Sequence, residues 1–218
     1  AHIVKADFTD ANLQDVWLGG VNLQNSVLHR ANLKYAILED ADLSYANLQG
    51  SCLQYVKASR LRMHHARADG IAGEFGEYMN ADITYCDMSD ARWDGANFTQ
   101  AIVQDIKWTR SSLDNADFSH AKLNTGNFND CFMRMTRLYD ANMEGAEIRN
   151  ADWHGAICDG NTRFANAKLS GILNLRAVTG LSGARWGGSD KDFDPSNPPD
   201  RSGSGSKPPH SWGPPKPK

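Results

Sequence analysis

Proline is absent from most of this chain. All eight prolines lie at or beyond Pro195, so a proline-free body is followed by a segment rich in proline, glycine, serine and lysine. This shift in composition predicts a boundary near residue 190. No eighteen consecutive residues are apolar, so no stretch reads as a membrane-spanning helix. The net charge of −3 gives no general attraction to nucleic acid or to anionic membranes.

Signatures of catalysis and metal binding are also missing. The four cysteines form no CxxC pair, and the adjacent His64 and His65 diverge in an extended segment, whereas a metal needs convergent ligands. No G-x-S-x-G frame and no phosphate-binding loop occurs. We therefore expect a non-enzymatic protein with no catalytic residue, no metal and no cofactor. An enzyme with an unrecognised site is kept as a remote alternative.

A five-residue repeat fills the proline-free body. Counted from Ala1, the third residue of each unit is usually large and apolar, as in Phe8, Leu33 and Phe118. The first residue is alanine in eighteen of thirty-two units, and the second is aspartate or asparagine in thirteen. Residues two apart point to the same side of an extended segment, and the two polar residues that follow suit a turn. One unit buries almost nothing, so stability must come from stacked coils.

The motif A-[DN]-[LF]-x-x, seen in Ala6-Asp7-Phe8 and Ala31-Asn32-Leu33, resembles the pentapeptide-repeat family, and the resemblance covers residues 1–158. It implies an all-β fold, a right-handed quadrilateral β-helix with four units per coil, hence about eight coils. It also implies a filled interior with no natural pocket.

Residues 58–80 interrupt the pattern of large and small residues. The third positions shrink to Ala68 and Gly73, while the first positions grow to Leu61 and Ile71. A swap of large and small residues conserves core volume. With twenty residues per coil, Gly73 lies beneath Trp93 and leaves space for its ring. We therefore predict an irregular but continuous coil.

The register slips by one residue after Cys158, and Phe164 and Leu169 resume it. We predict a β-helix over 1–171, a C-terminal cap over 172–188 and an extended tail rich in Pro, Gly and Ser over 189–218. The end of a β-helix exposes backbone and core, so it must be covered. The expected covering residues are Leu173, Leu175, Val178, Leu181 and Trp186.

The register also places outward residues in columns. A candidate partner-binding patch gathers apolar side chains on one corner and beside it, namely Trp17, Tyr35, Ile37, Tyr55, Phe75 and Met79. A second column holds Tyr45, His65 and Tyr85. Such columns are either ladders that stabilise the coil or an exposed docking surface, and we weigh the two equally. A candidate basic cluster, either a site for an acidic partner or lipid headgroup or a solvated turn, comprises Lys57, Arg60, Arg62 and Arg67.

These features favour a rigid scaffold that binds other protein subunits through its flat faces and its tail. The expected setting is a larger complex, photosynthetic or respiratory, with peripheral association with a membrane complex and no nucleic acid bound. The resemblance implies bacterial cytoplasm or chloroplast, and the missing initial Met favours a processed protein of the thylakoid lumen. The alternative that the resemblance offers is a DNA mimic that binds DNA gyrase, a type II topoisomerase. The net charge of −7 over residues 1–158 fits this alternative, but interspersed arginines oppose it.

Overall fold

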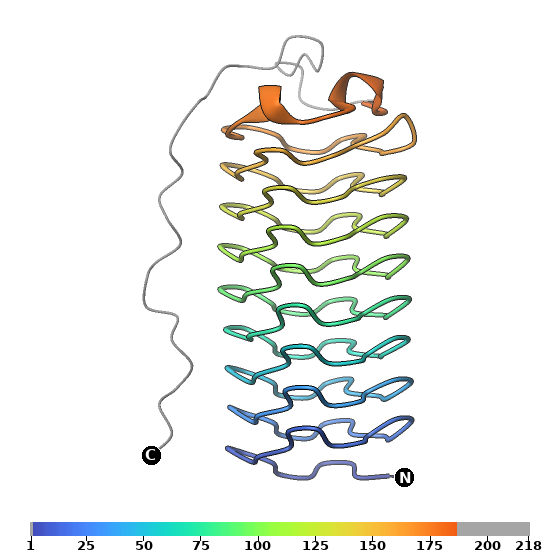
Figure 1. Cartoon of the computed structure of the whole chain (residues 1–218), viewed down its shortest axis with the longest axis vertical. Coiled ribbons are helices and arrows are strands. Elements are labelled where there is room, and N and C mark those ends of the chain that lie inside the picture. The colour runs from blue at the N-terminus through green and yellow to red at the C-terminus, as the bar shows by residue number, and fades with distance from the viewer. Residues whose placement is uncertain (1, 187–218) are drawn as a thin grey trace.

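The computed structural model describes residues 2–186 and shows a rod of stacked coils (Figure 1). Isolated parallel bridges join residues twenty apart, from His2 and Asn22 to Arg137 and Ile157. The spacing agrees with four five-residue units per coil. The register predicted from the sequence therefore describes how successive coils lie above one another, while the total of about eight coils stays a prediction from that register.

Each unit forms one side of the coil and one corner. The second residue pairs with the coils above and below, as Asn47 does with Val27 and Arg67. Where this residue is Asp or Asn, its Oδ1 accepts the N–H two residues later in every unit except that of Asp82, as between Asn47 and Gln49 at 3.1 Å. This local bond explains why the repeat prefers these two residues. The fifth residue lies in the left-handed region at almost every corner, which turns the chain onto the next side.

The core lies along the axis of the rod and consists of the third residues with the small first residues. Leucines such as Leu33 and Leu48 are completely buried. The irregular coil over 58–80 is continuous, because the bridges pass through it without a change in spacing. A Cβ placed on Gly73 would collide with the ring of Trp93, so Trp93 does occupy the space that the glycine leaves.

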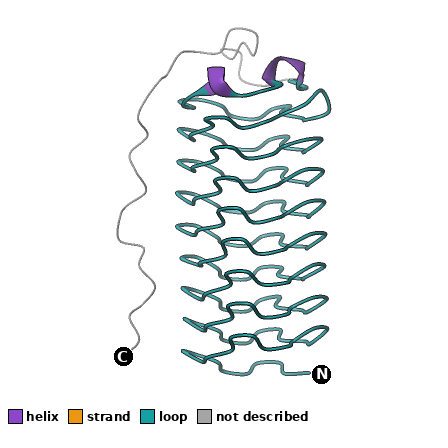
Figure 2. Ribbon diagram, viewed as in Figure 1, coloured by secondary structure: helices purple, strands orange, loops and turns teal. Residues whose placement is uncertain are grey.

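The last part of the described chain continues the ladder with insertions. Bridges there join residues 21 or 22 apart, as between Asp152 and Leu173 and between Arg163 and Arg185. Two 3₁₀ helices, η1 (Leu175–Ala177) and η2 (Leu181–Gly183), lie at this end of the rod and are the helices in Figure 2.

The side chains at this end cover the core. Leu175 and Leu181 are buried, Val178 packs against the core, and the ring of Trp186 stacks on Phe164 with centroids 4.5 Å apart. The expectation for Leu173 is wrong: it takes the outward bridge position and is half-exposed, while the preceding Ile172 is buried. The insertion shifts the inward position by one residue. The tail over 189–218 and the end of the segment 172–188 lie outside the described residues.

Two further findings concern residues 2–186. None of the helices described there is long and apolar enough to cross a membrane. No three His, Cys, Asp or Glu side chains within this range come together in a way that could hold a metal ion.

Candidate partner-binding surface

Six aromatic side chains stand at alternate corners of successive coils. They occupy fifth positions ten residues apart and all have positive φ: Tyr35, Tyr45, Tyr55, His65, Phe75 and Tyr85. Because a coil has twenty residues, these positions separate into two columns on opposite corners. We name them the Tyr35 ladder (Tyr35, Tyr55, Phe75) and the Tyr45 ladder (Tyr45, His65, Tyr85).

The rings of the Tyr35 ladder are stacked face to face. The centroid distances are 5.2 Å from Tyr35 to Tyr55 and 5.2 Å from Tyr55 to Phe75, with interplanar angles of 24° and 14°. The faces of the middle ring are therefore covered, and the ring edges point to solvent. The ammonium of Lys34 lies 5.0 Å from the Tyr35 centroid and 5.6 Å from that of Tyr55. Sequence reasoning missed this cation–π contact, although the direct adjacency of Lys34 and Tyr35 was a signal.

The Tyr45 ladder has the same geometry on the opposite corner. His65 lies between Tyr45, at 5.1 Å, and Tyr85, at 4.8 Å, with interplanar angles of 10° and 6°. The neighbouring His64 turns to a different partner set: its Nδ1 lies 2.5 Å from the Thr84 hydroxyl and its Nε2 lies 3.3 Å from Asp82. The two histidines thus diverge as predicted, although they lie in the turn of their unit and not in an extended segment.

Trp17 is the most exposed large apolar side chain among the described residues, at 76%. Its indole lies over Gly19, since a Cβ there would come within 2.7 Å of the Trp17 Nε1. Ile37 is the next residue in the same column and pairs with Trp17 by a backbone bridge. Met79 is half-buried, and the exposed Glu77 lies two residues before it on the same side. Trp17, Ile37 and the Tyr35 ladder therefore lie together, and Met79 lies at their edge.

The same side of the rod carries two further exposed apolar residues that sequence reasoning missed. Met135 lies in the corner column of the Tyr35 ladder, and Tyr139 lies in the column of Met79; both are exposed. Their positions, 60 residues beyond Phe75 and Met79, follow from the twenty-residue spacing and could have been read from it. We name the outward side of the units that begin at 16, 36, 56 and so on the Trp17 face.

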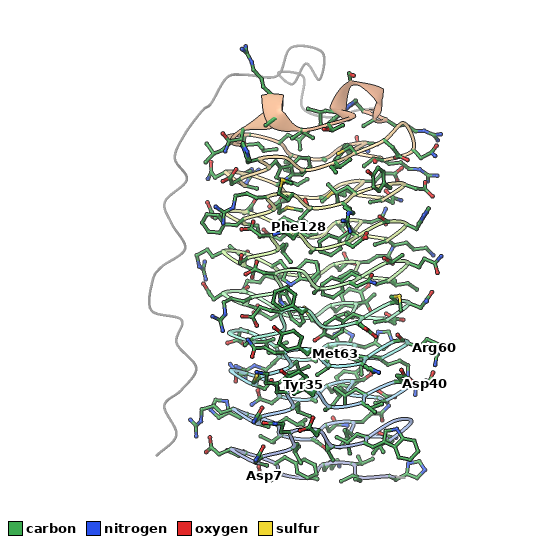
Figure 3. The ribbon with its side chains drawn as sticks, in the orientation of Figure 1. Asp7, Tyr35, Asp40, Arg60, Met63 and Phe128 are labelled. Atoms are coloured by element: carbon green, nitrogen blue, oxygen red, sulfur yellow. The ribbon has the colours of Figure 1, made fainter. Side chains whose placement is uncertain are left out.

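The candidate basic cluster is partly neutralised by the coil below it. Arg60 binds both carboxylate oxygens of Asp40, at 2.7 and 2.8 Å, and the two side chains adjoin in Figure 3. Arg62 lies 3.0 Å from Asp42. Within residues 2–186, no carboxylate oxygen lies within 4 Å of a Lys57 or Arg67 nitrogen. Two of the four cations thus hold adjacent coils together, and a role of the cluster in binding stays a prediction.

The cysteines divide as the register predicts. Cys86, Cys131 and Cys158 are buried and Cys52 is on the outside. Burial raises the pKa of each of the three buried thiols to about 12. Their thiolates are therefore scarce at neutral pH, and these residues act as small apolar side chains.

A column of carboxylates on another side of the rod contains one that lacks a cation. Glu74 pairs with Arg92 at 3.0 Å, and Asp114 pairs with Arg134, while Asp94 lies between them. Asp94 accepts hydrogen bonds from the Ser112 hydroxyl and from the Asp114 N–H, but no Lys or Arg nitrogen of the described chain lies within 4 Å of it. Burial, together with the charges of Asp114 and Glu74, raises the pKa of Asp94 above its ordinary value of 3.8.

Replacing Asp94 by asparagine should stabilise the protein at pH 7. The folded state holds the Asp94 proton to a higher pH than the unfolded chain, so stability falls as the pH rises from 3.8 through the raised folded-state pKa. We expect Asp94→Asn to raise the Tm by about 2–4 °C at pH 7, roughly 1 kcal/mol in a protein of this size, and to leave it nearly unchanged at pH 3. Thermal unfolding followed by circular dichroism at the two pH values measures this.

The matched control is Asp87→Asn, for which the expected change in Tm at pH 7 has the opposite sign. Burial alone would raise the pKa of Asp87, but hydrogen bonds from Ser89 and from the Lys107 ammonium at 2.9 Å hold it below its ordinary value. Its contribution is present above pH 3.8 and is lost as the pH falls. Asp87→Asn should therefore lower the Tm at pH 7, and a lowered Tm for Asp94→Asn as well would refute the electrostatic account.

Comparisons with known proteins agree on the repeat. The family profile described as pentapeptide repeats matches in eight copies, over residues 6–44, 22–57, 79–107, 94–130 and 116–155. No curated protein sequence gives a significant match. The stretch between 57 and 79 that the profile leaves out is the irregular coil, through which the structural bridges continue.

Several solved structures resemble this one. QnrB1, a plasmid-mediated fluoroquinolone resistance protein, has a TM-score of 0.52 and 14% identity, with 87% of this chain and 90% of that chain covered. HetL, a pentapeptide repeat protein involved in heterocyst differentiation regulation in the cyanobacterium Nostoc sp. strain PCC 7120, is 22% identical over 84% of this chain and 86% of its own, with a TM-score of 0.39. A pentapeptide repeat protein of the Arabidopsis thaliana thylakoid lumen is 22% identical over 54% of this chain and 62% of its own, with a TM-score of 0.18.

The likeness to QnrB1 concerns the fold alone, which is the right-handed quadrilateral β-helix that the repeat predicts. The profile matches together cover more than half of the chain, and the coil is continuous between them. The protein therefore belongs to the pentapeptide-repeat family.

Proposed function

We propose that this protein is a non-enzymatic scaffold subunit that binds other proteins through the Trp17 face and the Tyr35 ladder. The observation that carries the proposal is the exposure of Trp17 beside Ile37 and the ladder. Contiguous exposed apolar residues on a folded protein mark sites of interaction, and Trp and Tyr are the usual anchors of interfaces. An organellar photosynthetic or respiratory assembly is the setting that we propose for it.

The second candidate function is a DNA mimic that binds gyrase, favoured by the net charge of −7 over residues 1–158. The arrangement of these charges speaks against it. Arginines of one coil pair with aspartates of the coil below, as in Arg30 with Asp10 and Arg110 with Asp90. On the described part of the rod, such pairs interrupt the rows of carboxylates, unlike the continuous phosphates of a duplex. Undisturbed supercoiling by gyrase in the presence of the purified protein would exclude this candidate.

Replacing both Trp17 and Tyr55 by alanine should remove the protein from its native complex while leaving it folded. We expect at least a tenfold loss of retained partner, because two central anchors are lost. The Tm should fall by several degrees, for a loss of roughly 1–3 kcal/mol, because Tyr55 loses both of its stacked pairs. Affinity purification of the variant from its source, with thermal unfolding in parallel, measures both quantities.

The control is the same substitution on the opposite ladder, Tyr45→Ala with Tyr85→Ala. Those residues have the same backbone conformation and the same stacking, through His65, but lie on the other corner. The control variant should keep its partner. A large drop in the Tm of both variants, with partner retention unchanged, would show that the ladders serve the coil and would refute the proposal.

A further inference from the structure

Most of the exposed apolar surface lies along one side of the rod. Of the nine large apolar side chains that are exposed among residues 2–186, six belong to the Trp17 face or to the corner column of the Tyr35 ladder: Trp17, Tyr35, Tyr55, Phe75, Met135 and Tyr139. They occur near both ends of the rod, from the first coil to the coil of Tyr139. The whole side, and not only one patch, is therefore the surface to explain.

The order of residues along the main column of this face is self-complementary. The bridges give the order Trp17, Ile37, Lys57, Glu77, Asn97, Asp117, Arg137 and Ile157. When a second, inverted copy of the column is laid against the first, Trp17 faces Ile157, Lys57 faces Asp117 and Glu77 faces Asn97. Ile37 then lies against the aliphatic part of Arg137. Apolar ends thus meet apolar ends, and Lys57 meets Asp117 on each side of the centre, where Asp117 also lies 3.4 Å from Arg137 of its own chain.

The corner column gives the same match with the same centre. Tyr35 faces Met135 of the inverted copy, a favourable contact between sulfur and an aromatic ring. Tyr55 faces Asn115. Phe75, which leans over Gly95 in its own chain, faces Gly95 of the second copy. The contacts that this column offers to an inverted copy are therefore Tyr35 with Met135 and Tyr55 with Asn115, while Gly95 is already covered by Phe75 of its own chain.

A parallel arrangement of two copies loses this match. A two-fold axis along the rod would place the Tyr35 ladder against the next corner, where Asp40 and Arg60 form an exposed ion pair. Aromatic edges would then face charged groups. The antiparallel arrangement has one like-charge pair at its rim, Asp40 opposite Asp140, and these residues already pair with Arg60 and His120.

The dimensions of the face suffice for a weak specific interface. Layers about 4.8 Å apart give a rod roughly 40 Å long, and a five-residue side is at most about 17 Å wide. Each copy therefore covers at most about 680 Å², and the total of at most about 1,400 Å² reaches the lower limit of specific interfaces, about 1,200 Å².

We propose that the Trp17 face binds a second copy of this chain, in an antiparallel arrangement about a two-fold axis perpendicular to the rod near the level of Glu77 and Asn97. This inference rests on the proposed role of the face in protein binding and names the partner. In such an isologous interface every contact occurs twice. Each copy then supplies Lys57 to the other's Asp117.

Sedimentation velocity of the purified chain at about 1–100 μM tests the proposal through charge reversal. We expect a dimer that Lys57→Glu weakens at least tenfold, because the introduced carboxylate would face Asp117 twice. Asp117→Lys should weaken it equally, because the introduced ammonium would face Lys57 twice. An equimolar mixture of the two variants should dimerise again. The mixed pair places the introduced carboxylate against the introduced ammonium on one side and keeps Asp117 against Lys57 on the other.

The substituted residues suit the fold, since the same position of other units holds Lys107, Lys122, Glu77 and Glu147. Circular dichroism confirms that each variant is folded. Lys122→Glu, an exposed charge reversal on another side, is the matched control and should dimerise normally.

A monomer at 100 μM, or a dimer that neither charge reversal weakens, would overturn the inference. So would a mixture of the two variants that stays monomeric. If the chain is monomeric and the Trp17→Ala and Tyr55→Ala variant still loses a native partner, this inference fails and the proposed function stands.

Discussion

Replacing Trp108 by alanine should lower the free energy of unfolding by about 3–5 kcal/mol. Trp108 is completely buried, and its ring lies 5.4 Å from Phe98, 5.4 Å from Phe118 and 5.5 Å from Phe128, measured between centroids. Alanine would leave a cavity among three rings that cannot close, because the coils on either side are held at a fixed spacing by their backbone bridges. Urea unfolding followed by circular dichroism measures the loss.

The conservative variant Trp108→Phe distinguishes the contribution of side-chain volume to stability from that of a hydrogen bond by the indole N–H. The Trp108 Nε1 is buried and has no hydrogen-bond partner among the described residues. Phenylalanine therefore loses no bond and removes an unsatisfied donor, so we expect a cost of about 1 kcal/mol from the smaller ring. A cost for Trp108→Phe equal to that of Trp108→Ala would show that the indole N–H binds a group that packing does not explain.

Replacing Gly73 by alanine should cost about 1–3 kcal/mol, although alanine is normally tolerated in an extended segment. The added Cβ would collide with the Trp93 ring, and that ring is fixed by Tyr78 at 5.3 Å and Phe98 at 5.6 Å. The ring has no free direction in which to move. Thermal or urea unfolding of the single variant gives the size of the effect.

A double-mutant cycle tests the cause. In a Trp93→Leu background, which places at this position the leucine that the next coil holds at Leu113, the Gly73→Ala change should cost less by about 1–2 kcal/mol. Gly160→Ala is the control, because its Cβ would meet its nearest atom at 3.7 Å, an ordinary contact. Additive effects of Gly73→Ala and Trp93→Leu would contradict the contact.

Replacing an aromatic residue inside the rod should have a different effect from replacing one on its surface. Trp93 and Trp108 are fixed among other rings, so their loss should lower stability and leave binding intact. Trp17 and the edge of the Tyr55 ring are exposed to solvent, so their loss should chiefly weaken binding. The five-residue register separates the two groups, since Trp93 and Trp108 are third residues of their units, Trp17 is a second residue and Tyr55 is a fifth.

The sequence by itself determined the coil and its columns. The repeat resembles the pentapeptide-repeat family, and that resemblance implies four five-residue units per coil. The resulting spacing of twenty places Tyr35, Tyr55 and Phe75 in one column and Gly73 under Trp93. The family profile passes over residues 58–78, but the exchange of large and small residues there already indicated a continuous coil.

Only the tertiary structure decided which charged side chains of adjacent coils form ion pairs and which residues cover the C-terminal end of the described rod. Arg60 and Arg62 read as a free basic cluster until Asp40 and Asp42 are found beneath them. Ile172, and not Leu173, is buried, because the loop inserted after Cys158 shifts the inward position. A repeat fixes the position of each Cα, and therefore each column. Contacts with neighbouring coils set the rotamer of a long side chain and the path of a non-repeating segment. These contacts do not repeat every five residues, so the sequence pattern does not reveal them.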